Sequence, residues 1–93
     1  MFQLENNGYN MTFENGYTVS VRWHKCINYI TGRTMGCSTA AMEAMATDSV
    51  DAEVAVIDAT GKFLETPFNE NDTVIGYAAP EDVLKIMEWT VTL

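Results

Sequence analysis

The sequence predicts a single α+β domain over residues 1–93. We expect an antiparallel β-meander sheet of about five to six strands, with one short helix and a C-terminal helix packed on it. Three observations lead to this prediction. Apolar and polar residues alternate in several short segments, as they do in half-buried strands. Glycine-containing turns separate these segments at hairpin spacing, and the end of the chain changes to helical periodicity after a proline.

The first hairpin is predicted from residues 9–13 and 17–23, which alternate on either side of the turn Glu14-Asn15-Gly16. A two-residue Asn-Gly loop would set apolar residues opposite polar ones. A three-residue loop with Gly16 in the left-handed conformation sets apolar residues opposite one another. Its pairs are Phe13 with Tyr17, Met11 with Val19 and Tyr9 with Val21. Residues 4–9 echo this motif, which indicates a short leading strand.

A second hairpin is predicted from residues 53–58 and 62–66 around the turn Ala59-Thr60-Gly61. A three-residue loop with Gly61 in the left-handed conformation places apolar residues opposite apolar residues, and an acidic residue opposite a basic one. The expected pairs are Asp58 with Lys62, Ile57 with Phe63 and Val56 with Leu64.

The remaining elements are two helices and a last strand. Residues 38–46 are alanine-rich behind an N-cap candidate at Ser38 or Thr39, which predicts a short helix. Residues 73–78 are expected to form the last strand, and Pro80 suits the first position of the C-terminal helix. On that helix we expect the sheet-facing side chains to be Val83, Leu84, Ile86, Met87 and Val91. Those expected to face water are Glu81, Lys85 and Glu88.

The charge is acidic and unevenly distributed. The chain carries a net charge of −8, of which −7 falls on residues 51–93. This balance disfavours direct DNA or RNA binding and anionic membranes, and suits a basic protein surface. The acidic residues that we select as a partner-binding surface are Asp72, Glu81, Asp82 and Glu88. Two cysteines, Cys26 and Cys37, are expected to be free thiols, and without an export or membrane segment we expect a cytoplasmic location.

Residues 22–33 hold three of the five basic residues together with two aromatic ones. Aromatic faces stack on bases and cationic groups pair with phosphate, so this segment is a candidate pocket for a small nucleotide. The ligand-binding residues that we select are Arg22, Trp23, Lys25, Tyr29 and Arg33. The alternative interpretation is structural: Trp23 continues the inward-facing set of Val19 and Val21, and the basic residues solvate a strand end.

Catalytic and metal chemistry have weak support in the sequence. His24 is the only histidine, and with Cys26 and Cys37 it lacks the close ligand pairs of structural zinc sites. The acidic residues Asp48, Asp51, Glu53 and Asp58 fall in turns or at strand edges and are interpreted as solvated. We therefore expect a non-enzyme that uses no catalytic residue, cofactor or metal.

The stretch from Phe13 to Val21, F-E-N-G-Y-T-V-S-V, is followed shortly by Asn28-Tyr29 and resembles small uncharacterised proteins encoded by tailed bacteriophages. Further segments that fit the same pattern are residues 52–56, Asp58 with Gly61 and Phe63, and residues 72–83. The resemblance implies a phage or prophage origin and a role in the host-cell cytoplasm, and it assigns no catalytic residue.

Small accessory phage proteins often act by binding, which leads to three functional expectations. The first is an inhibitor that occludes a bacterial host or anti-phage defence protein through its acidic surface. The second is sequestration of a small nucleotide immune signal by residues 22–33, where a homo-oligomer would allow a pocket across the interface. The third is a minor structural protein of the virion.

Overall fold

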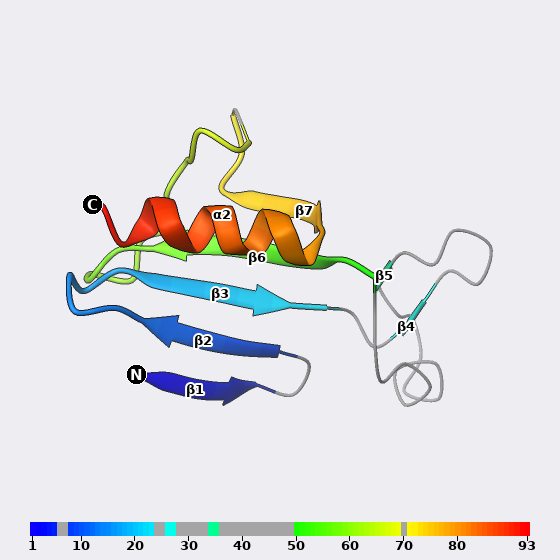
Figure 1. Cartoon of the computed structure of the whole chain (residues 1–93), viewed down its shortest axis with the longest axis horizontal. Helices are drawn as coiled ribbons and strands as arrows, with labels where there is room; N and C mark the ends of the chain where they lie inside the picture. The colour runs from blue at the N-terminus through cyan, green and yellow to red at the C-terminus, as the bar shows by residue number, and fades with distance from the viewer. Residues whose placement is uncertain (6–7, 24–25, 28–33, 36–49, 70) are drawn as a thin grey trace.

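Five antiparallel strands form the main sheet of the protein in a computed structural model, which describes residues 1–5, 8–23, 26–27, 34–35, 50–69 and 71–93 (Figure 1). The strand order is β1-β2-β3-β6-β7, so neighbours in this sheet follow one another along the chain. The bounds are Phe2–Glu5 for β1, Gly8–Thr12 for β2, Thr18–Arg22 for β3, Ala52–Ile57 for β6 and Val74–Ala78 for β7. The predicted α+β meander is confirmed, with five strands in this sheet.

A separate two-stranded pair joins β4 (Cys26–Ile27) to β5 (Thr34–Met35). It lies within the stretch between β3 and β6. The short helix predicted for residues 38–46 falls outside the described residues.

The first hairpin has the predicted register. Tyr9 lies opposite Val21, and Met11 lies opposite Val19. The amide of Phe13 donates to the carbonyl oxygen of Tyr17 at 2.9 Å, which closes a three-residue loop. Gly16 has a φ of 88°, the left-handed conformation that this loop requires. The leading strand is also confirmed as β1, which pairs with β2.

The second hairpin has the predicted register but a shorter second arm. The amide of Asp58 donates to the carbonyl oxygen of Lys62 at 2.9 Å, Ile57 bridges Phe63, and the amide of Leu64 donates to the carbonyl oxygen of Val56. Residues 62–66 were expected to be a full strand, and this was wrong. Strand β7 pairs with Ala52, Val54 and Ala55 on the same edge of β6, so the returning arm can pair only at the far end of that strand.

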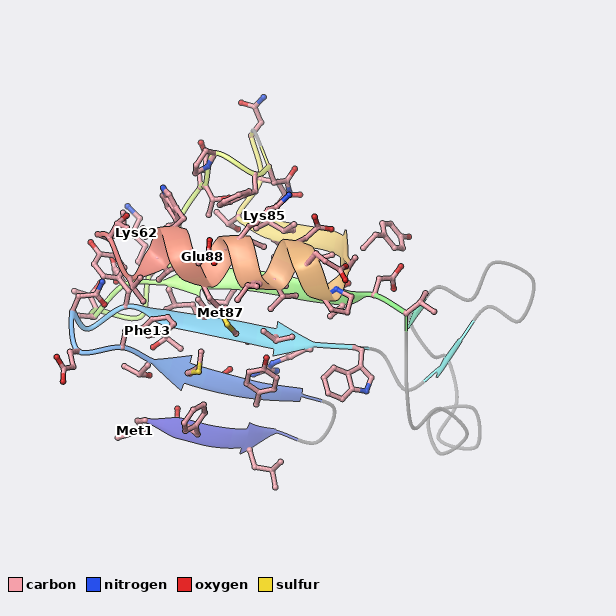
Figure 2. The ribbon with its side chains drawn as sticks, in the orientation of Figure 1. Met1, Phe13, Lys62, Lys85, Met87 and Glu88 are labelled. Atoms are coloured by element: carbon pink, nitrogen blue, oxygen red, sulfur yellow. The ribbon has the colours of Figure 1, made fainter. Side chains whose placement is uncertain are left out.

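Helix α2 (Pro80–Thr90) begins at the predicted proline and packs against β3 and β7 on one face of the sheet (Figure 1). Asp82 accepts a hydrogen bond from the amide of Ala79 at 2.9 Å and so caps the first turn. The buried core between the helix and the sheet consists of Val19, Val21, Ala52, Val54, Val56, Ile75, Ala78 and Ile86. Tyr9, Trp23 and Met87 pack around it, and Figure 2 shows Met87 directed towards the sheet.

The predicted inner face of α2 was partly wrong. Ile86 is fully buried, but Leu84 is 58% exposed and Val91 is 51% exposed. Thr90, which was not expected to face the core, is fully buried and donates its hydroxyl to the carbonyl oxygen of Ile86 at 2.7 Å. The inner face therefore follows helical spacing from Val83 through Ile86 to Thr90. Leu84 is the residue after Val83, so its side chain is rotated by about 100° around the helix axis, away from the sheet.

Strand β7 contains a β-bulge opposite β6. Ala52 pairs with Ala78 and Val54 pairs with Ile75, so Gly76 and Tyr77 together lie opposite one residue of β6. Tyr77 has a φ of 57°, in the left-handed region. A bulge of this kind bends a strand and interrupts its ladder of hydrogen bonds.

The loop between the second hairpin and β7 packs on the end of α2. The ring of Phe68 meets the ring of Trp89 edge to face, with centroids 6.1 Å apart. In the part of the chain that the structure describes, no helix is long and apolar enough to cross a membrane.

Candidate functional site

The outward surface of α2 and its C-cap residue Val91 carry acidic and apolar side chains in one stripe. Glu81, Leu84, Glu88 and Val91 recur at intervals of three and four residues, which places them on the same side of a helix. All four are exposed. We name these residues the outer stripe. Exposed apolar residues framed by charge are typical of protein-binding surfaces, so the outer stripe is a candidate interface.

Two of the four acidic residues selected from the sequence also have local structural roles. Asp82 caps the first turn of α2, and Asp72 accepts a hydrogen bond from the amide of Val74 at 3.1 Å, just before β7. Glu81 and Glu88 lie on the outer stripe, and Figure 2 shows Glu88 on the helix beside Lys85. The structure therefore places Glu81 and Glu88 together on α2 and Asp72 in the preceding loop.

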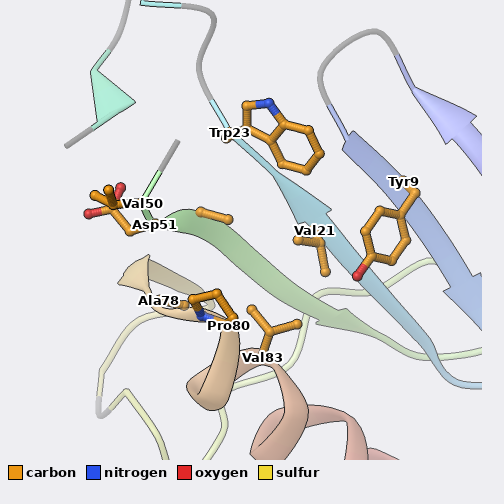
Figure 3. A pocket seen from close by; sticks show the side chains of 9 residues that line it. Tyr9, Val21, Trp23, Val50, Asp51, Ala78, Pro80 and Val83 are labelled. Carbon is orange, nitrogen blue, oxygen red and sulfur yellow. The ribbon is translucent and has the colours of Figure 1, made fainter. Parts of the chain in front are cut away.

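A cavity of about 250 Å³ lies where the start of α2 meets the ends of β3, β6 and β7 (Figure 3). It opens on the same face of the sheet as the helix. Its lining residues are Tyr9, Val21, Trp23, Val50, Asp51, Ala52, Ala78, Pro80 and Val83. This cavity is smaller than the roughly 300–1,000 Å³ of typical ligand pockets, and its size suits one small ring.

The walls of this cavity are mostly apolar, with two aromatic rings from Tyr9 and Trp23 (Figure 3). Asp51, which was interpreted as a solvated edge residue, is only 7% exposed, so that interpretation was wrong. Asp51 directly precedes Ala52, which pairs with Ala78 of β7, and it lines the cavity together with Pro80. The described lining contains one acidic and no basic residue, which favours a neutral or aromatic group over a phosphate.

Arg22 lies on the other face of the sheet from Trp23, because successive residues of a strand point to opposite sides. Arg22 pairs with Glu53 in the register of β3 and β6. The two residues border a shallow groove of about 190 Å³, whose other lining residues are Ser20, Val54, Ala55, Ile57, Phe63 and Val74. The structure therefore separates Arg22 from Trp23 instead of bringing them into one pocket.

The other selected ligand-binding residues, Lys25, Tyr29 and Arg33, lie outside the described residues. Nucleotide binding by residues 22–33 stays a prediction. Tyr9 and Asp51 were missed as neighbours of Trp23. The hairpin register could have found Tyr9, since it lies opposite Val21 on the same face, whereas Asp51 approaches only through the tertiary fold.

Titratable groups in the described part of the chain form no cluster of three or more that could hold a metal ion. His24 and Cys37 lie outside the described residues, as does the side chain of Cys26. Asp58 has a pKa below its ordinary value of 3.8, chiefly because the hydroxyl of Thr60 and then the amide of Lys62 donate hydrogen bonds to its carboxylate. This carboxylate stabilises the second hairpin turn.

Comparison with protein-family models, with curated proteins and with solved structures finds no match to this chain.

Proposed function

We propose that this chain is a non-catalytic binding protein that occludes a bacterial host or anti-phage defence protein. The observation that carries the proposal is the outer stripe of α2. Leu84 lies between Glu81 and Glu88, Val91 follows Glu88 by one turn, and both apolar side chains are more than half exposed, whereas Ile86 on the inner side of the helix is fully buried. Apolar contact between charged residues is the composition of a small protein interface.

Charge complementarity supports a basic partner. Residues 51–93, which include the whole of α2, carry −7 of the net charge of −8. An acidic surface accelerates association with a basic one, and salt screens that attraction. Binding to the host protein should therefore weaken as ionic strength rises.

The resemblance to phage proteins supports the choice of target. The F-E-N-G-Y-T-V-S-V segment resembles proteins of tailed bacteriophages, and small accessory phage proteins often act by binding.

The test is affinity purification from bacteria that carry defence systems, with tagged wild-type chain and a Leu84→Ser/Val91→Ser variant. Phe63→Ser is the matched control, because Phe63 is also an exposed apolar residue but lies on the second hairpin. We expect a partner that the wild type and the control retain and the stripe variant loses, with retention decreasing at higher salt. A partner retained by the stripe variant, or unaffected by salt, would contradict the proposal.

Sequestration of a small nucleotide is the second candidate, and the aromatic walls of the cavity beside Trp23 support recognition of its base. Trp23 and Tyr9 provide two aromatic rings in a space that fits one base. The sequence offers Lys25 and Arg33 as candidate phosphate-binding groups. Calorimetric titration with cyclic nucleotides and ADP-ribose derivatives tests this function: heat of binding that disappears in Trp23→Ala supports it, and no heat with any of these ligands excludes it.

A further inference from the structure

The outer edge of β1 presents the backbone groups of Phe2 and Leu4. The amide of Thr12 donates to the carbonyl oxygen of Met1, and the amino group of Met1 donates to the carbonyl oxygen of Thr12, both at 2.8 Å. Bonded pairs alternate along an antiparallel ladder, so Gln3 with Asn10 is the next bonded pair. Phe2 and Leu4 therefore direct their N–H and C=O groups away from β2.

The side chains of Phe2 and Leu4 are also available at this edge. They are 77% and 93% exposed, and their register partners Met11 and Tyr9 place them on the face of the sheet that carries α2. Helix α2 packs against β3 and β7 and leaves β1 uncovered in the described part of the structure. An unprotected strand edge with apolar side chains is a site for pairing with another strand.

The two edges of the sheet differ in how they are protected. Strand β7 carries the bulge at Gly76 and Tyr77, which disrupts pairing of a further strand. Strand β1 contains neither a bulge nor a proline or lysine. An added strand is therefore expected at β1 and not at β7.

We infer that β1 pairs antiparallel with β1 of a second copy of this chain, about a two-fold axis at Gln3. This register places Phe2 opposite Leu4 of the second copy and Leu4 opposite its Phe2, so the exposed N–H and C=O groups of these residues pair with one another. Apolar side chains then meet on one face, and the two Gln3 side chains meet on the other. The sequence Phe2-Gln3-Leu4 is thus complementary to itself, as an isologous interface requires.

The charge distribution favours a second copy at this edge. Residues 1–23 contain only Glu5, Glu14 and Arg22 as charged side chains, whereas most of the acidity belongs to residues 51–93. Strand β1 lies at the opposite end of the strand order from β7, so pairing through β1 keeps the acidic halves apart. One short strand buries less than the roughly 800 Å² per partner of a stable complex, so the dimer should be reversible and concentration-dependent.

Sedimentation of the full chain at increasing concentration tests the inference. We expect the mass to rise from 10.4 kDa towards twice that value. Leu4→Pro removes an outward N–H while leaving the bonds of Gln3 to β2, and should weaken association at least about tenfold. Leu4→Val, which keeps the amide, is the matched control and should still dimerise. A mass of one chain at every concentration, or a Leu4→Pro variant that dimerises normally, would overturn the inference.

Cross-linking tests the register. Across the two-fold axis the Cα atoms of the two Gln3 residues would lie about 4.5 Å apart, within the range of a disulfide. Oxidised Gln3→Cys should therefore form a covalent dimer, with peptide mapping placing the bridge at position 3. Leu4→Cys should not, because the substituted positions are diagonal neighbours about 7–8 Å apart. Equal cross-linking of both variants would contradict this register.

Salt dependence separates this inference from the proposed function, on which it does not rest. Self-association of two acidic chains should strengthen as salt screens their repulsion, whereas binding to a basic host protein should weaken. Dimerisation that weakens with salt would contradict pairing through the nearly neutral β1 edge.

Discussion

The side-chain amide of Asn15 donates to the carbonyl oxygen of Thr90 at 2.9 Å, across a separation of 75 residues. The same amide reaches the carbonyl oxygen of Leu93 at 3.3 Å, and the Asn15 side-chain oxygen accepts from the amide of Tyr17 at 3.1 Å. The last carbonyl groups of a helix lack donors within the helix. The last turn of α2 has no basic residue, so Asn15 supplies a donor from the first hairpin turn.

Replacing Asn15 should therefore destabilise the whole domain and not only its turn. We expect Asn15→Ala to lower the free energy of unfolding by about 1–2 kcal/mol, because it removes all three of these hydrogen bonds. Asn15→Asp keeps the acceptor for Tyr17 but sets a negative charge against the helix C-terminus, so it should be at least as destabilising at neutral pH. Urea unfolding measures both variants. An Asn15→Asp variant as stable as the wild type would show that the contact with Thr90 contributes nothing.

Gly8 lies where a side chain has no room. A Cβ added there would lie 2.0 Å from the carbonyl oxygen of Val21 and 2.8 Å from the Cα of Arg22, both backbone atoms of β3. We expect Gly8→Ala to destabilise the protein by about 3 kcal/mol, because β2 must move away from β3. Gly76→Ala, which meets no atom within 4 Å, is the control for losing a strand glycine. Equal thermal stability of the two variants would contradict this account.

The carboxylate of Asp58 should titrate below 3.8, the ordinary pKa of the group. Because its pKa is lowered on folding, its stabilising contribution is present above pH 3.8 and is lost as the pH falls through the lower folded value. The Thr60 hydroxyl donates to this carboxylate at 2.6 Å. Thr60→Val should therefore raise the pKa of Asp58, which NMR titration of the carboxyl carbon measures. If that pKa does not change, the backbone amides of Lys62 and Thr60, and not the Thr60 hydroxyl, lower the pKa of Asp58.

Truncation of two nearby side chains of α2 should change the stability by very different amounts. Ile86 is fully buried, so we expect Ile86→Ala to lower the free energy of unfolding by about 3 kcal/mol. Leu84 lies on the outer stripe, so Leu84→Ala should change it by less than about 0.5 kcal/mol. Chemical denaturation measures both. A Leu84→Ala variant as unstable as Ile86→Ala would mean that the helix is rotated relative to the sheet.

The two hairpins could be predicted because their information is local. Loop length, the position of glycine and the alternation of side chains together determine the register, and each is readable within about ten residues. Residues 62–66 could not be predicted in the same way. Their strand ends early because β7 occupies the rest of that β6 edge, and this competition is a property of the tertiary fold.

The orientation of α2 was harder to predict because side-chain type and position disagree. Leu84 and Val91 are apolar but lie outside, while Thr90 is polar but lies inside. Thr90 tolerates burial because its hydroxyl donates to the carbonyl oxygen of Ile86. Helical spacing from Val83 therefore predicts which side chains of α2 face the sheet better than their hydrophobicity does.

The separation of Arg22 from Trp23 could have been predicted from strand geometry alone, since adjacent strand residues face opposite ways. The cavity beside Trp23 could not, because its walls come from segments that are far apart in the chain.

Strand β6 pairs along one edge with β3 and along the other with two segments in turn, β7 at its start and the returning hairpin arm at its end. Its amides are consequently enclosed on both sides by separate parts of the chain. Opening either segment exposes only half of that edge to solvent. Complete exchange of β6 amides with deuterium therefore requires both β3 and the segments on the other edge to separate from it, so we expect this strand to be the slowest-exchanging part of the described sheet.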